Sequence, residues 1–209
     1  AFRLAEARSG ALCAVGSYDT PKEGVHGDYR GATIGASPVY SYTAHVVEVR
    51  VDRATGDVNV VSVWAAHDLG RAINPVLAEG QVVGSVAMGL GEALLEHHHT
   101  MDHGLDLVAS ARQRRAPAPG VAGLLRTDSL LGYAIPGAMD APEIAATLVE
   151  CPDPLGPHGA REAGEGPLHP ALPALANAVF DAVGVRIDAL PLTPERVRAA
   201  LRAAESTKS

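Results

Sequence analysis

Residues 67–91 read HDLGRAINPVLAEGQVVGSVAMGLG, a polar connector followed by the helix on which the predicted fold depends. The Asn-Pro pair at 74–75 is a typical helix start, because asparagine caps the first turn and proline suits the first helical position. The helix is unusual because Gly80, Gly84 and Gly91 are expected on one face, and an interior glycine costs about 1 kcal/mol relative to alanine. We therefore expect another helix or a ligand to approach its backbone closely.

The sequence before this connector predicts a β-hairpin. Residues 44–51 alternate between apolar and polar, which is typical of a strand with one buried face. A turn containing Gly56 follows, and a second β-rich run covers residues 58–66. In the first run, we expect Val47, Val49 and Val51 on one face, and His45, Glu48 and Arg50 mostly on the other.

Further elements are expected after the connector. The glycine-containing helix should end near Glu96, with Leu77 and Leu90 among its apolar positions. The other expected elements are a strand at 143–150, a helix at 170–183, alternating residues at 185–189 and a helix capped by Thr193-Pro194 that ends near 204. The predicted class is α+β, with helices packed on a mixed or antiparallel sheet.

Composition along the chain predicts how it is organised. Residues 1–39 are rich in glycine, tyrosine and serine without periodicity, so we expect an extended lead-in that continues from an upstream part. Residues 40–204 are expected to form one domain and residues 205–209 a polar tail. Within the domain, the basic, Pro/Gly-rich stretch at 110–127 is predicted to be an inserted, exposed loop.

Bulk composition argues against several classes of partner. The net charge of −7 and scattered basic residues disfavour nucleic acid or an anionic membrane. No apolar run has the length of a membrane span. Cys13 and Cys151 are the only cysteines, too few for the four ligands of an iron–sulfur cluster, and are predicted to be buried small apolar side chains. We expect a soluble, cytoplasmic protein.

The histidines at 97–99 and 103 do not predict a metal site. Adjacent side chains on a strand point to opposite faces, so three consecutive histidines converge poorly on one ion. A partly exposed strand is the preferred interpretation, and no metal-ligating residue is predicted. The pair His67-Asp68 lacks a serine in a Gly-x-Ser-x-Gly turn, which disfavours a hydrolase.

Three segments carry a resemblance to a known family. They are residues 40–75, the glycine-rich EGQVVGSVAMGLG at 79–91 and GPHGAREAGEGP at 156–167. In order and spacing they resemble the large, molybdopterin-binding subunit of the molybdenum hydroxylases, which include xanthine dehydrogenase, aldehyde oxidase and 4-hydroxybenzoyl-CoA reductase. The resemblance implies the fold of the second molybdenum cofactor-binding domain of that family.

Glu165, in the Gly-Glu-Gly turn of the third segment, matches the active-site glutamate of the family. The resemblance implies that it is a general base, taking a proton from a hydroxyl on the molybdenum as that hydroxyl attacks an electron-poor carbon. Without the resemblance, a surface carboxylate in a glycine loop would be the preferred interpretation. Glu162, three residues earlier, is expected to have no part in proton transfer.

The resemblance also implies five cofactor-binding residues. Gly164 and its loop are expected to offer backbone N–H groups near a helix start, a common way of holding pyrophosphate-like anions. Gln81 and Met88 are seven residues apart, hence roughly on one helix face, and Gly84 and Gly89 complete the set. The xanthine dehydrogenase branch has glutamine near the position of Met88, so a helix-core filler is an equal alternative for this methionine.

The implied function is the C-terminal part of a molybdopterin subunit, incomplete and inactive as an isolated chain. Its reaction would be hydroxylation of an electron-poor carbon using water, or reductive dehydroxylation of an aromatic acyl-CoA. The implied cofactor is molybdenum–molybdopterin, with the cytosine dinucleotide form as one option. The implied partners are the upstream half of the subunit, an iron–sulfur subunit, an FAD subunit and a small-molecule substrate. The alternative is a non-catalytic remnant or assembly module that keeps the fold without the cofactor.

Overall fold

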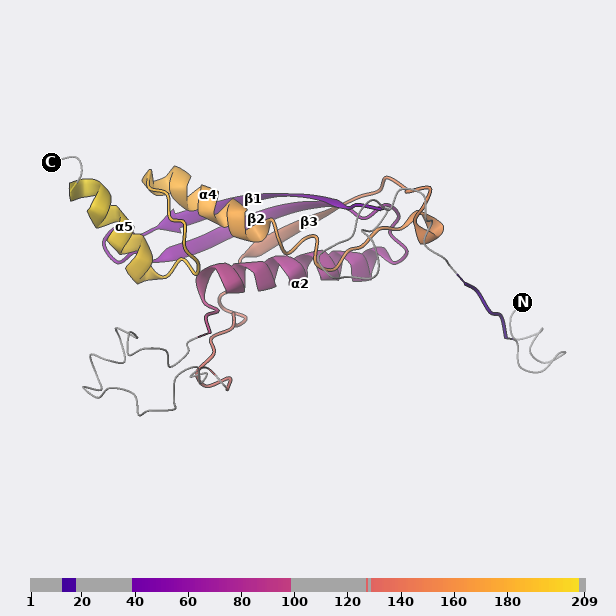
Figure 1. Cartoon of the computed structure of the whole chain (residues 1–209), viewed down its shortest axis with the longest axis horizontal. Coiled ribbons are helices and arrows are strands. Elements are labelled where there is room, and N and C mark those ends of the chain that lie inside the picture. Colours follow the sequence, from indigo (N-terminus) through magenta and orange to yellow (C-terminus); the bar gives the residue numbers. More distant parts are fainter. Residues whose placement is uncertain (1–12, 18–38, 99–126, 128, 207–209) are drawn as a thin grey trace, which may run out of the picture.

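The computed structural model describes residues 13–17, 39–98, 127 and 129–206. Three strands, three helices and one short 3-10 turn make up the described fold (Figure 1). In chain order they are β1 (Tyr42–Val51), β2 (Val58–Asp68), α2 (Pro75–Leu94), β3 (Glu143–Val149), the turn η1 (Pro157–Gly159), α4 (Ala171–Val183) and α5 (Pro194–Ser206).

The strands form one mixed sheet in the order β1-β2-β3. β1 and β2 pair antiparallel as the predicted hairpin, with Val47 opposite Val63, whereas β2 and β3 pair parallel, with Val63 opposite Ile144. A parallel pair needs a crossover connection, and the segment containing α2 provides it. The α+β class with a mixed sheet is therefore confirmed.

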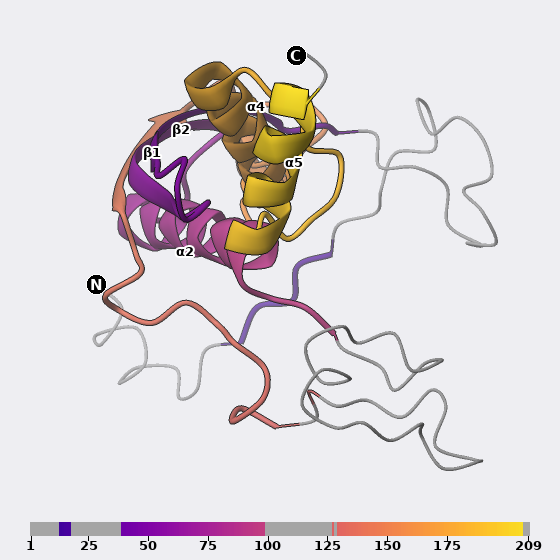
Figure 2. The ribbon, with the colours of Figure 1, turned by 90° about the vertical axis from the view of Figure 1, so that its left-hand side faces the viewer.

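The helices cover one face of the sheet. Figure 2 shows α2 and α4 beside each other on its concave side, α4 over β1 and α2 over β3. The core combines Val63 and Ala65 of β2, Val82 and Val86 of α2, Leu175 and Val179 of α4, and Val197 and Leu201 of α5. Burial of such a side chain stabilises a fold by about 1.5–3 kcal/mol.

Two helix starts that the sequence predicts are capped in the structure. The Asn74 side chain accepts a hydrogen bond from Leu77 N at 3.2 Å, and Pro75 is the first residue of α2. At the start of α5, Thr193 accepts from the backbone N–H of Val197 through its carbonyl and from that of Arg196 through its hydroxyl. Both predicted helix starts are confirmed.

The outer face of the sheet carries exposed apolar residues. Tyr42, Val46, Trp64 and Val149 are exposed there, and Val46 and Trp64 are directly opposite each other in the ladder. Trp64, the only tryptophan of the chain, is 47% exposed. A contiguous exposed apolar face of this kind commonly marks an interaction surface.

Several expectations need correction. His45 lies on the same inner face as Val47, Val49 and Val51, because these positions share the strand period of two. Residues 185–189 form no strand, although Val185 and Ile187 pack against the core. Cys13 and Cys151 are both exposed, so neither is a buried apolar side chain. Leu77 is 66% exposed, whereas Leu90 is in the core as expected.

Other predictions fall largely outside the described residues. They concern the inserted loop at 110–127, most of the lead-in at 1–39 and the histidines at 99 and 103. The domain boundaries stay predictions. Among the described residues, no helix combines the length and the apolar character needed to cross a membrane.

Candidate functional site

The segment that leads to Glu165 is attached to the end of β2. At the end of β3, Val149 O accepts a hydrogen bond from Leu69 N, and Leu69 O accepts one from Arg161 N at 2.7 Å. Gly70 has a φ of +72°, and a Cβ there would lie 2.3 Å from Gly159 O. Only glycine permits this backbone approach without strain. The connector that follows β2 thus holds both ends of the loop at 150–161.

Two aspartates orient Arg161 at the base of this loop. The guanidinium lies 2.6 Å from Asp68 and 3.3 Å from Asp153, and its side chain is 11% exposed. Asp68 also accepts from Gly70 N at 3.0 Å. Ion pairs shielded from water are screened much less than surface pairs. Arg161 therefore fixes the backbone immediately before Glu162.

Glu162 accepts three hydrogen bonds from its own surroundings. They come from Ser41 Oγ, from Gly164 N at 2.9 Å and from Gly166 N at 3.2 Å. Burial tends to raise the pKa of Glu162, but these three hydrogen bonds and the nearby His67 outweigh it and lower the pKa below its ordinary value. The turn at 163–166 thus wraps around an ionised carboxylate.

This arrangement corrects the expected role of the loop N–H groups. The N–H of Gly164 already donates to Glu162 and is not presented to an outside anion. A Cβ on Gly166 would lie 2.0 Å from Glu162 Oε1, so a larger residue there would displace the carboxylate. At Gly164 a Cβ would meet no atom of the described part of the chain within 4 Å, so this position borders open space there.

A buried histidine at the end of β2 is hydrogen-bonded to the same loop. His67 is fully buried at the end of β2, with Nε2 2.8 Å from the carbonyl oxygen of Glu162 and Nδ1 2.6 Å from Thr43 Oγ1. A carbonyl oxygen only accepts, so Nε2 must carry the proton. Nδ1 pairs with the Thr43 hydroxyl, so both ring nitrogens of His67 have a hydrogen-bond partner.

His45 lies on the same inner face of β1 as Thr43, two residues further along. Both of its ring nitrogens are buried and have no hydrogen-bond partner among the described residues. Burial lowers the pKa of His45, and the nearby His67 lowers it further. His45 is therefore expected to be neutral at pH 7.

Glu165 is exposed at the tip of the turn. Its carbonyl accepts from Leu168 N at 3.0 Å, which leads the chain into α4. Ser85 of α2, itself buried, donates to Gly164 O at 2.6 Å. This bond places the turn with Glu165 beside the middle of α2.

α2 presents an exposed stripe beside this turn. Gln81, Gly84 and Met88 are all exposed, with Met88 at 56%, so Met88 is not a helix-core filler. A Cβ on Gly80 or Gly84 would meet no atom within 4 Å. The described residues therefore do not explain these two glycines, and the open backbone fits a flat ligand or a partner that approaches closely.

Gly89 and Gly91 differ from these two glycines. A Cβ on Gly89 would lie 2.7 Å from Ala171 Cβ and 2.8 Å from Leu168 O, so Gly89 belongs to the packing of α2 against the start of α4. A Cβ on Gly91 would lie 2.8 Å from Pro136. Of the four glycines, only Gly80 and Gly84 border open space, and the structure places Gly89 away from the stripe.

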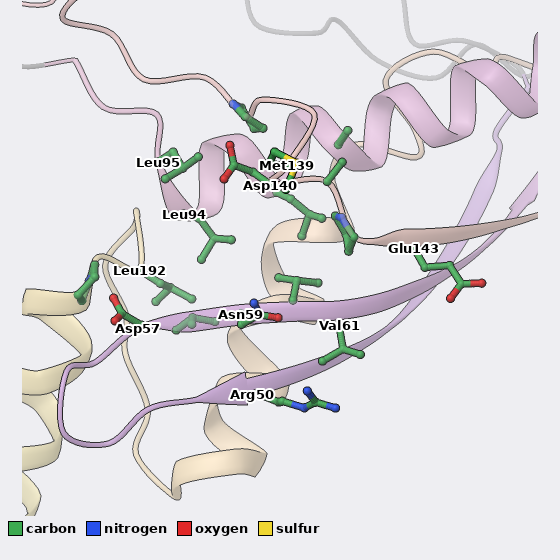
Figure 3. Close-up of a pocket in the computed structure, with 18 residues that line it drawn as sticks. Arg50, Asp57, Asn59, Val61, Leu94, Leu95, Met139, Asp140, Glu143 and Leu192 are labelled. Atoms are coloured by element: carbon green, nitrogen blue, oxygen red, sulfur yellow. The ribbon is translucent and has the colours of Figure 1, made fainter.

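A cavity of about 580 Å³ lies elsewhere, near the β1–β2 turn. Leu94 at the end of α2, the following Leu95, Asp57, Met139 and Asp140 surround it (Figure 3). These residues are at the opposite end of β2 from Asp68 and His67. The cavity is therefore separate from the Glu165 turn.

The described histidines at 97 and 98 do not form a strand. The His98 ring lies 5.0 Å from the Tyr133 ring, centroid to centroid. Within 13–17, 39–98, 127 and 129–206, no three His, Cys, Asp or Glu side chains form a group that could hold a metal ion.

Comparison with known proteins identifies the family. The family model of the molybdopterin cofactor-binding domain matches residues 2–142. The chain therefore belongs to the molybdopterin cofactor-binding domain family. Within it, the match is to the molybdenum-binding subunits of xanthine dehydrogenases and aldehyde oxidoreductases, as the resemblance implied.

Three relatives illustrate the match. A putative xanthine dehydrogenase molybdenum-binding subunit of Escherichia coli K12 is 36% identical over 72% of this chain and 18% of the relative. The aldehyde oxidoreductase structure from Desulfovibrio gigas has a TM-score of 0.63 and 33% identity, over 78% of this chain and 16% of that one. Quinoline 2-oxidoreductase from Pseudomonas putida 86 has a TM-score of 0.60 and 32% identity, over 74% of this chain and 18% of that one. The chain thus spans less than a fifth of each relative.

Proposed function

We propose that this chain is the C-terminal, glutamate-bearing part of the molybdopterin subunit of a molybdenum hydroxylase. The observation that carries the proposal is the hydrogen bond from Ser85 to Gly164, because it brings the Glu165 turn beside the exposed stripe of α2. Gln81, Gly84 and Met88 on that stripe would contact the cofactor, and Gly164 would let it approach the turn. Gly89 would act indirectly, by holding α2 against α4.

The cofactor and Glu165 would have different chemical roles. The bound cofactor would supply the oxidation or reduction at an electron-poor carbon. The carboxylate of Glu165 would accept a proton. It would do so without a hydrogen-bond partner from the described part of this chain. A general base must lie within hydrogen-bond reach of the proton it takes, and an exposed position at the tip of a turn offers that reach.

The finer reaction is also part of the proposal. It is either hydroxylation using water or reductive dehydroxylation of an aromatic acyl-CoA. The cytosine dinucleotide form of the cofactor is one option. We propose a cytoplasmic location, since the described helices include none that could cross a membrane.

Other chains would complete the enzyme. The upstream half of the subunit is proposed to enclose the cofactor over the exposed stripe of α2 and to cover the apolar outer face around Trp64. Electrons would pass to an iron–sulfur subunit and an FAD subunit, since the two cysteines of this chain are too few for a cluster. On its own the chain is expected to be inactive.

Metal analysis of the native assembly tests this proposal. The assembly that contains this chain, purified from its native host, should hold molybdenum and a pterin in amounts close to those of the chain. If the assembly forms but contains neither, the chain is a remnant or assembly module that keeps the fold without the cofactor.

A further inference from the structure

We propose that Glu162 is a positioning residue, which shapes the turn at 163–166 around its own side chain and so sets the direction of Glu165. The effect on catalysis rests on the proposed function, but the positioning itself does not. The sequence alone predicts no proton-transfer role for Glu162.

The first argument is the set of hydrogen bonds. One oxygen of Glu162 accepts both Gly164 N and Gly166 N, which flank Glu165 on its two sides. The other oxygen accepts from Ser41 Oγ, just before β1. The two peptide groups around Glu165 are therefore tied to a single carboxylate, which is in turn tied to the sheet.

The second argument is the support for Glu162 itself. Its carbonyl oxygen accepts from buried His67, and the preceding residue, Arg161, is held by Asp68 and Asp153. The backbone of Glu162 therefore cannot move without breaking its contact to β2, and its carboxylate cannot move without breaking the bond to Ser41, just before β1. A rigid support of this kind is what holds a reactive side chain in one orientation.

The third argument is the fit of the turn around the side chain. Gly166 has no room for a Cβ because Glu162 Oε1 occupies that space. Gly166 also keeps an N–H to donate, which a proline at this position would lack. Glu162 and Gly166 are therefore a matched pair: the carboxylate needs the N–H, and the glycine leaves room for the carboxylate.

A positioning role and a proton-transfer role predict opposite responses to glutamine. Glutamine at 162 can accept both glycine N–H groups with its oxygen and donate its amide N–H to Ser41 Oγ. All three hydrogen bonds then survive without the charge. Alanine at 162 removes all of them. At a general base, in contrast, glutamine cannot accept the proton at all.

Amide hydrogen exchange of the 209-residue chain tests the positioning without any cofactor. In Glu162→Ala, exchange at Gly164 and Gly166 should accelerate at least about tenfold relative to wild type, since two hydrogen bonds to a charged group are lost. In Glu162→Gln the acceleration should be about threefold or less, and exchange at core residue Val82 should be unchanged in both variants. Wild-type protection of both glycines in Glu162→Ala would overturn the proposal.

Turnover of the assembled enzyme provides the second readout. Glu162→Ala should lower kcat about tenfold or more with normal molybdenum content, whereas Glu162→Gln should keep kcat within about threefold. Added formate should restore part of the kcat of Glu162→Ala, by supplying the missing carboxylate to the two N–H groups. If Glu162→Gln is as impaired as Glu162→Ala, the positioning role is wrong. If the wild-type assembly lacks molybdenum but the exchange results hold, only the proposed function fails.

Discussion

Glu165→Gln in the assembled enzyme is expected to keep the cofactor and lose turnover by about 10² or more, the range for loss of a general base. Glutamine keeps the size and hydrogen-bonding reach of the side chain but cannot accept the proton. The side chain of Glu165 is exposed in this chain, so the fold should not depend on it. Steady-state kinetics combined with molybdenum and pterin analysis measure both quantities.

Two control variants test whether the loss of turnover is specific to Glu165 or follows the removal of any carboxylate. Glu195→Gln changes an exposed glutamate in the first turn of α5, near the β1–β2 turn and far along the sheet from Glu165, and should leave turnover unchanged. Glu162→Gln changes a carboxylate of the same loop and should have a small effect. Equal losses in Glu165→Gln and Glu162→Gln, or loss of molybdenum from Glu165→Gln, would mean that Glu165 has a structural role.

Gly84→Leu is expected to lower the molybdenum and pterin content of the assembly by about tenfold or more. A Cβ at Gly84 has open space in this chain, and leucine is about 1 kcal/mol better than glycine in a helix, so the chain itself should be as stable as wild type or slightly more. The leucine would instead occupy the space that we assign to the cofactor, and a loss of about 1.4 kcal/mol of binding free energy is tenfold in affinity.

Gly89→Leu is the matched control on the same helix. There the new side chain would collide with Leu168 and Ala171, and such overpacking typically costs about 1–3 kcal/mol of stability. Urea unfolding of the two variants should therefore show a destabilised Gly89→Leu and an unaffected Gly84→Leu. Normal cofactor content in Gly84→Leu would show that the open face of α2 has another role.

The sequence predicted the elements well because their signals are local. Alternation in β1, the Asn74 cap of α2 and the Thr193 cap of α5 each depend on a few neighbouring residues. The face of His45 was misassigned because a histidine looks polar, whereas the strand period places it inward. Residues 185–189 lack a strand partner, and only the sheet order reveals that.

The network under the Glu165 turn could not be predicted, because its contacts join distant parts of the chain. Ser41 and Glu162 are 121 residues apart, and His67 and Glu162 are 95 apart. One local signal was available: an acidic residue two and four positions before glycines can accept the N–H groups of both. The different environments of Gly84 and Gly89 likewise depend on where α4 begins. The sequence of α2 alone does not give that position.

A density map of the native assembly tests the central claim most directly. The account predicts that Glu165 faces the molybdenum, that the stripe of Gln81, Gly84 and Met88 contacts the pterin, and that the N–H groups of Gly164 and Gly166 still donate to Glu162. A cofactor bound elsewhere, for example in the cavity near the β1–β2 turn, with Glu165 directed into solvent, would contradict it.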